Sequence, residues 1–106
     1  MENKFITIFV TCGSVKEAGR IADSLLSKRL VACANIIPGI KSIFRWQGKV
    51  DKAAEILVMM KTRSSNFARI EKEVKRLHSY EVPEIIALPI VAGSKDYLKW
   101  IDSSVR

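Results

Sequence analysis

The sequence contains one histidine and only two cysteines among its 106 residues. A single histidine excludes a metal site that is built from several histidines of one chain. The sequence also has no glycine-rich phosphate loop, no CxxC pair, no HExxH motif and no GxSxG turn. These absences argue against P-loop nucleotide hydrolysis, dithiol redox chemistry, zinc proteolysis and serine hydrolase chemistry.

Long apolar runs and export signals are missing as well. No stretch approaches the roughly 18 apolar residues of a transmembrane helix. The first twelve residues, MENKFITIFVTC, contain the acidic Glu2 and lack a basic leader and a small-residue cleavage site, so we expect no signal peptide. Without export, Cys12 and Cys33 are expected to be reduced thiols in a cytoplasmic protein.

The composition is that of a folded protein, with 48% hydrophobic and 27% charged residues. We therefore expect a single domain over residues 1–106. The net charge is +7, but the lysines and arginines are scattered and no run of five or six occurs. This pattern predicts a solvated basic surface without specific nucleic-acid binding, and it leaves a small anionic ligand open.

Residues 30–62 form one long, nearly continuous strand-like stretch, around which the rest of the chain is organised. Two strand-like arms, residues 31–46 and 54–62, flank a predicted turn at residues 47–52. Pro38 and Gly39 interrupt the first arm and predict a bulge, because proline removes a ladder donor and glycine relaxes the backbone. The arms contain more apolar side chains than one sheet face can cover, so we expect the surplus to contact another chain.

The remaining segments alternate between strand and helix patterns. Residues 5–11 predict a central strand. A helix is expected to begin at Ser14, which forms a capping box with Glu17. A second helix is expected after the possible caps Ser64 and Ser65. Residues 84–91 predict a strand, in which Pro89 favours an edge position. A last helix is expected to begin at Ser94. The expected inward-facing residues of the three helices are Ala18, Ile21, Ala22, Leu25 and Leu26; Phe67, Ile70, Val74 and Leu77; and Tyr97, Leu98, Ile101 and Val105.

The resulting order is β-α-β-β-α-β followed by a C-terminal helix. A split βαβ unit repeated around a hairpin is typical of the ferredoxin-like α+β fold, in which helices cover one face of an antiparallel sheet.

Residues 77–84, LHSYEVPE, form the most informative polar cluster. One imidazole, one phenol and two carboxylates lie close together where a helix leads into a strand. Imidazole and carboxylate suit copper or zinc. Alternatively, His78 interacts only with the dipole of the helix end. Trp46 and Tyr80 are expected to form a wall of a small-molecule cleft, or else to pack at an interface.

The two cysteines are expected to differ in their surroundings. Cys33 lies in an apolar run and is predicted to be a core residue. Cys12, beside Gly13, is predicted to be the more accessible. An enzyme that uses Cys12 as its nucleophile is one alternative, but no base and no substrate motif accompany it.

Several segments of the chain resemble the CutA divalent-cation tolerance proteins. They are LVACANIIPG at 30–39, SIFRWQGKV at 42–50, KTR at 61–63, LHSYEVPEIIALPI at 77–90 and YLKWI at 97–101. The resemblance implies a ferredoxin-like fold, a tight trimer similar in plan to PII-type signalling proteins, a cytoplasmic setting and a role in tolerance of copper and other divalent metals.

The resemblance also concerns the proposed copper ligands of some members. His78 matches one ligand histidine, whereas Leu77 stands where certain members have a second. Val10 occupies the position of the ligand cysteine, and Cys12 lies close to it. Ser79 replaces the usual proline of the turn.

These observations together predict a non-catalytic trimer that binds a metal or a small ligand. The candidate metal ligands are His78, Glu84 and Cys12, with Cu²⁺ or another divalent cation as the ion. The candidate cleft residues are Trp46, Lys61, Tyr80 and Glu81. The alternative is a structural or signalling trimer without a metal role.

Overall fold

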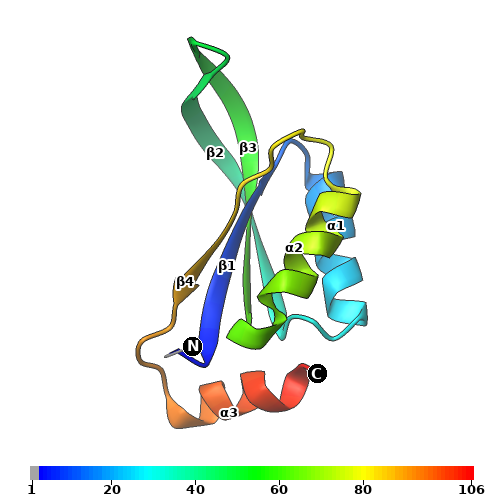
Figure 1. Cartoon of the computed structure of the whole chain (residues 1–106), viewed down its shortest axis with the longest axis vertical. Helices are drawn as coiled ribbons and strands as arrows, with labels where there is room; N and C mark the ends of the chain where they lie inside the picture. Colours follow the sequence, from blue (N-terminus) through cyan, green and yellow to red (C-terminus); the bar gives the residue numbers. More distant parts are fainter. Residues whose placement is uncertain (1–2) are drawn as a thin grey trace.

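Four antiparallel strands form one sheet in the order β2-β3-β1-β4 in the computed structural model, which describes residues 3–106. Figure 1 shows α1 and α2 side by side over one face, and α3 at the end of the sheet away from the hairpin. This arrangement confirms the ferredoxin-like fold with an added helix. The elements are β1 (Phe5–Cys12), α1 (Val15–Ser27), β2 (Cys33–Trp46), β3 (Lys49–Arg63), the 3-10 helix η1 (Ser64–Asn66), α2 (Phe67–Leu77), β4 (Ile85–Pro89) and α3 (Lys95–Ser104).

Strand β1 is central, and every second residue of it is buried against the helices. Strict alternation of buried and partly buried residues follows from the two-residue period of a strand. The helices cover this face with Ile21 and Leu25 of α1 and with Ile70 and Val74 of α2, all fully buried. The predicted stripes of α1 and α2 thus supply the core, apart from Leu26, which is exposed at the edge of its stripe.

The hairpin of β2 and β3 is longer than expected because its turn is shorter. Trp46 pairs with Lys49, so only Gln47 and Gly48 form the turn, and both have positive φ as a type I′ turn requires. The predicted turn over residues 47–52 was wrong in its extent. Residues 49–52 continue the ladder, and the hairpin projects from a molecule 44 Å in its longest dimension (Figure 1).

The predicted bulge lies where the register between β2 and β3 shifts. Ile37 pairs with Leu57 and Ile40 with Glu55, so Pro38 and Gly39 together oppose one residue. Gly39 has a φ of 82°, which favours glycine. The bulge therefore bends the hairpin away from the rest of the sheet.

The sheet face opposite α1 and α2 remains largely uncovered and apolar. We call it the open face. Phe9 is paired with Met59 on one side and with Ile86 on the other, so these three side chains share this face. The exposed Ile37 and Leu88 extend it at the two edges of the sheet.

The ends of the helices differ in how far they follow expectation. Ser64 and Ser65 do not cap α2, because they form η1. Ser94 does cap α3, since its Oγ accepts a hydrogen bond from the Tyr97 backbone at 3.2 Å. Tyr97 itself is exposed, whereas Ile101 is buried as predicted.

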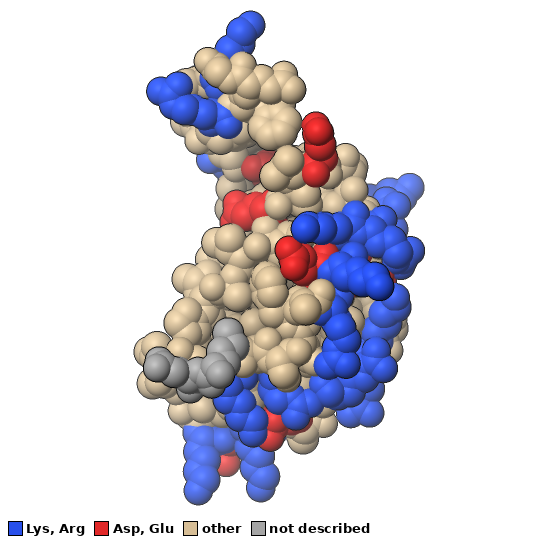
Figure 2. All heavy atoms as spheres, viewed as in Figure 1, with Lys and Arg blue, Asp and Glu red and all other residues tan. Residues whose placement is uncertain are grey.

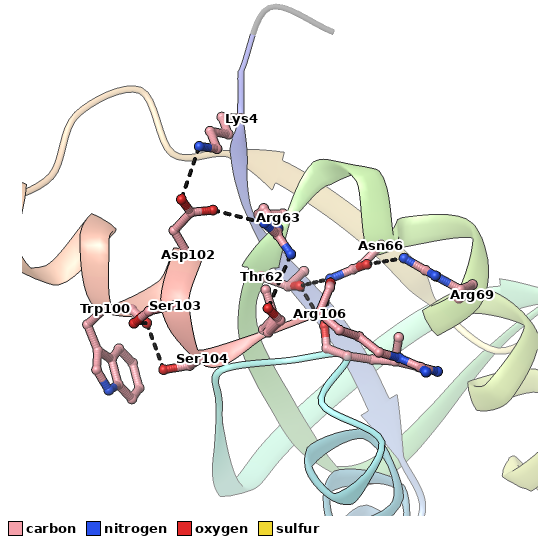
Figure 3. A network of polar contacts seen from close by, with 12 residues as sticks. Lys4, Thr62, Arg63, Asn66, Arg69, Trp100, Asp102, Ser103, Ser104 and Arg106 are labelled. Carbon is pink, nitrogen blue, oxygen red and sulfur yellow. Dashed lines mark hydrogen bonds and ion pairs between the residues drawn. The ribbon is translucent and has the colours of Figure 1, made fainter.

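Helix α3 is held to the sheet by a polar network around Asp102 (Figure 3). The two carboxylate oxygens of Asp102 pair with Lys4 at 3.2 Å and with Arg63 at 3.1 Å. Arg63 also donates to the Val105 carbonyl at 3.2 Å. These contacts connect the beginning of β1, the end of β3 and α3.

A second polar cluster joins α1 to α2 through the buried Glu73. This carboxylate accepts hydrogen bonds from Arg76 and Lys28 at 2.8 Å and from the Ser24 hydroxyl. Figure 2 shows many lysines and arginines over these helices, so Glu73 offsets part of a strongly basic surface. The hydrogen bonds from Arg76, Lys28 and Ser24 hold the pKa of Glu73 well below its usual 4.5.

Glu73→Gln is expected to reduce the sensitivity of thermal stability to acid. Because the folded-state pKa is lowered, the stabilisation is complete above about pH 4.5 and declines as pH falls further. Thermal melts between pH 7 and pH 2.5 should show a lower Tm for Glu73→Gln at pH 7 and a smaller decrease on acidification. Glu71→Gln, which removes only the exposed pair with Lys75, is the control and should follow the unmodified protein. An equal acid-induced decrease in Glu73→Gln would contradict this role.

Candidate functional site

Three side chains from distant segments converge where β1 ends. They are Cys12 at the end of β1, Glu17 in the first turn of α1 and His78, which follows α2. One potential ligand atom from each lies within 4.8 Å of the other two. We call these residues the Cys–Glu–His group.

The imidazole of His78 is buried and has a defined orientation. Its Nε2 lies 2.7 Å from the Thr11 carbonyl oxygen, which can only accept, so Nε2 carries the proton. Nδ1 then presents its lone pair. It accepts from the Tyr80 backbone at 3.1 Å and lies 3.2 Å from Glu17 Oε1. A backbone carbonyl that fixes the tautomer in this way is typical of metal-binding histidines.

Glu17 has a role beyond the capping box that was predicted from the sequence. Its backbone N–H donates to Ser14 Oγ at 3.1 Å, so half of the predicted capping box forms. The carboxylate turns instead towards His78 and accepts from the Ser79 backbone at 3.3 Å. The sequence does contain one signal for this role. Glu17 is an acidic residue in the first turn of a helix that directly follows a strand.

Both predictions about the cysteines were wrong. Cys12 is fully buried, because the alternation of β1 turns it towards the helices, whereas Cys33 is partly exposed at the beginning of β2. Burial and the nearby carboxylates of Glu17 and Glu55 raise the pKa of the Cys12 thiol to about 11. A buried, protonated thiol is a poor nucleophile, which argues against the enzyme alternative.

A cavity of about 770 Å³ lies between the hairpin and the segment after α2. Three of the predicted cleft residues, Trp46, Tyr80 and Glu81, line it together. Lys61 does not, because it lies on the open face and donates to Asn35. Glu84, predicted as a metal ligand, lines this cavity and is not part of the Cys–Glu–His group.

Tyr80 connects the cavity with the Cys–Glu–His group. Its ring centroid lies 4.7 Å from that of His78, and its hydroxyl donates to Glu55 Oε2 at 2.8 Å. Burial and this hydrogen bond raise the pKa of Tyr80 to about 12, so the hydroxyl remains a donor at neutral pH.

Comparison with known proteins decides the family. Residues 6–104 match the profile of the CutA1 divalent ion tolerance protein. The chain belongs to the CutA family. It is 51% identical to the divalent-cation tolerance protein CutA of Archaeoglobus fulgidus over 99 residues, which cover 93% of this chain and 96% of that protein.

A solved CutA structure and a plant relative extend this comparison. The divalent cation tolerance protein of Thermus thermophilus superposes with a TM-score of 0.94 at 42% identity, covering 96% of this chain and 99% of that one. The chloroplastic CutA 1 of rice is 48% identical over 102 residues, but the chain spans only 57% of its length. The family is named for tolerance of divalent ions and not for a catalysed reaction.

None of the helices within residues 3–106 is both long and apolar enough to span a membrane.

Proposed function

We propose that this CutA protein binds a divalent cation of the copper class at the Cys–Glu–His group and acts in metal tolerance or response without catalysis. The observation that carries this proposal is the convergence of a thiol, a carboxylate and an imidazole nitrogen. Sulfur and imidazole donors favour Cu²⁺ or Zn²⁺ over Mg²⁺ and Ca²⁺. Glu17 takes the place that Glu84 had in the prediction from sequence.

Cation binding at this group would compete with a proton and with one backbone hydrogen bond. The Cys12 thiol is protonated at neutral pH because of its raised pKa, so a metal that binds the sulfur must release this proton. A cation at His78 Nδ1 must also displace the Tyr80 N–H. Affinity is therefore expected to increase with pH.

His78→Ala is expected to weaken Cu²⁺ binding by at least about tenfold, because it removes the only imidazole of the chain. The effect should be largest below pH 7, where carboxylates alone are poor copper ligands. Isothermal titration with Cu²⁺ and Zn²⁺ measures it. Glu84→Gln is the control for a nearby carboxylate, and Cys33→Ser is the control for the second thiol.

Both control variants should bind as the unmodified protein does. Equal affinity in His78→Ala would remove His78 from the site, and a loss in Cys33→Ser would move the metal to the other cysteine.

We further propose that three copies assemble through the open face and the hairpin. Ile86 on the open face is 47% exposed, and Ile43 on the hairpin is 67% exposed. Contiguous exposed apolar side chains of this kind mark protein interfaces. A closed ring of three also covers the edges of the sheet, which otherwise invite pairing with further chains.

A second candidate function is an interaction or signalling trimer of PII-like plan without a metal role. The extent of the open face favours this candidate, since assembly alone would explain why its apolar side chains are exposed in the single chain. A stable trimer that shows no saturable Cu²⁺ or Zn²⁺ binding would support this alternative.

We propose a cytoplasmic setting, in which both free thiols remain reduced. Known relatives are described as chloroplastic in rice and periplasmic in A. fulgidus. Cell fractionation with an antibody against the chain would test the compartment.

A further inference from the structure

The cavity beneath the hairpin is bounded by the part of β2 and β3 that lies beyond the bulge. A bulge of this kind bends a hairpin, and the cavity lies between the part of the hairpin beyond it and residues 80–84. Its volume of about 770 Å³ lies within the range of small-molecule sites in proteins.

Three aromatic side chains line the cavity. Phe44 and Trp46 come from β2, and Tyr80 comes from the segment after α2. Each of the three remains roughly 40% exposed in the single chain, so part of each ring faces the cavity. Aromatic faces attract cations, and Trp does so most strongly.

The charged residues of the wall are mainly acidic. Asp51, Glu55, Glu81 and Glu84 line the cavity, against two lysines, Lys41 and Lys52. Among residues 3–106, none of the four carboxylates forms an ion pair with a lysine or arginine. Figure 2 shows acidic side chains at the base of the hairpin, in contrast to the basic surface over the helices.

Glu55 is the most informative of these carboxylates. It is only 7% exposed, and its one side-chain partner among the described residues is the neutral Tyr80 hydroxyl. A buried carboxylate without a cationic partner is unfavourable. Its place in the cavity wall means that a cationic ligand would supply the missing partner.

We propose that this cavity binds a small organic cation, of which aliphatic polyamines are the simplest class. Ammonium groups would pair with Glu55 and with Glu81 or Glu84, while the methylene chain would lie against the aromatic wall. The acidic lining disfavours the small anionic ligand that the net charge had left open. This site adjoins the Cys–Glu–His group through Tyr80 but has its own set of carboxylates, and it goes beyond the proposed metal function.

Spermidine is a suitable probe because it combines several ammonium groups with a flexible hydrocarbon chain. Isothermal titration of the assembled protein at low ionic strength should show saturable binding. Glu55→Gln should weaken that binding by about tenfold or more, because it removes the charge but keeps an acceptor for Tyr80. Glu84→Gln should weaken it less, since Glu84 is exposed. Glu71→Gln, on the outer side of α2, is the control and should bind normally.

Tryptophan fluorescence can locate the bound ligand. The chain has two tryptophans; Trp46 lines the cavity, whereas Trp100 lies on α3 beside Tyr97. In a Trp100→Phe background, spermidine should change the emission of Trp46. In a Trp46→Phe background, the emission of Trp100 should not change.

The metal and amine sites are expected to respond to different variants. His78→Ala should lose Cu²⁺ and keep spermidine, and Glu55→Gln should do the reverse. No saturable spermidine binding, equal affinity in Glu55→Gln, or tighter binding of citrate than of spermidine would overturn the proposal. The proposal would also be overturned if Mn²⁺ displaced spermidine and if Mn²⁺ binding were lost in Glu55→Gln. The cavity would then be a site for inorganic cations.

Discussion

Ile86→Asp is expected to dissociate the proposed trimer into monomers. Ile86 lies on the open face beside Phe9, with which it is paired, and 47% of its surface is exposed in the single chain. A carboxylate at this position would have to be buried among apolar side chains without a partner in the assembled protein. Breaking a central interface contact typically costs about 2–4 kcal/mol or more, and the change would occur three times in one trimer.

Light scattering and sedimentation velocity on dilute protein measure this effect. Val15→Asp is a matched control, because Val15 is equally apolar and 58% exposed but lies at the start of α1 on the other side of the sheet. A folded, soluble monomer of the unmodified protein at micromolar concentration would contradict the proposed assembly. An intact trimer of Ile86→Asp would exclude the open face from the interface.

Trp46→Asp applies the same measurement to the hairpin. The tip of the hairpin is expected to lie against a neighbouring subunit, so this variant should also weaken assembly. If the trimer is unchanged but spermidine binding is lost, Trp46 belongs to the cavity and not to the interface.

Asn66→Ala is expected to destabilise the fold by about 2–3 kcal/mol, since it leaves buried polar groups without partners. Asn66 is completely buried at the start of α2. Its Nδ2 lies 3.1 Å from the Arg106 carbonyl, 3.2 Å from Thr62 Oγ1 and 3.4 Å from the Leu30 carbonyl, and its Oδ1 accepts from Arg69 (Figure 3). The side chain thus connects β3, α2 and the segments before β2 and after α3.

Urea unfolding at a fixed protein concentration would measure the loss, because assembly makes apparent stability depend on concentration. Ser65→Ala, at the exposed neighbouring position, is the control and should change the free energy of unfolding by less than about 0.5 kcal/mol. A similarly small change in Asn66→Ala would contradict this prediction. It would show that water or nearby groups replace the Asn66 side chain as the hydrogen-bond partner of the groups it contacts.

Local patterns in the sequence predicted the order of the helices and strands and most of their extent. The apolar stripe of α1, the cap at Ser14 and the alternation of β1 depend on residues that are close in sequence, so they can be identified without the fold. The bulge at Pro38 and Gly39 and the edge position of Pro89 follow from the missing backbone donor of proline. Composition likewise indicated a surplus of apolar side chains in the hairpin.

The make-up of the candidate sites depended on contacts between distant residues. The His78 ring contacts Thr11, 67 positions earlier, and lies beside Glu17, and no local pattern encodes either distance. Because β1 pairs with β3 and ends beneath α1, Cys12 is buried and cannot be the accessible thiol.

Lys61, predicted for the cleft, and Glu84, predicted as a metal ligand, both lie elsewhere in the structure, and for the same reason. Lys61 and Glu84 have side chains suited to a site, but strand alternation turns Lys61 to the open face, and the path after α2 places Glu84 in the cavity wall. Residue type and spacing along the chain determined which elements form and which side chains have useful chemistry. The order, pairing and bend of the strands decided which of those side chains meet, because sheet contacts join residues that are far apart in sequence.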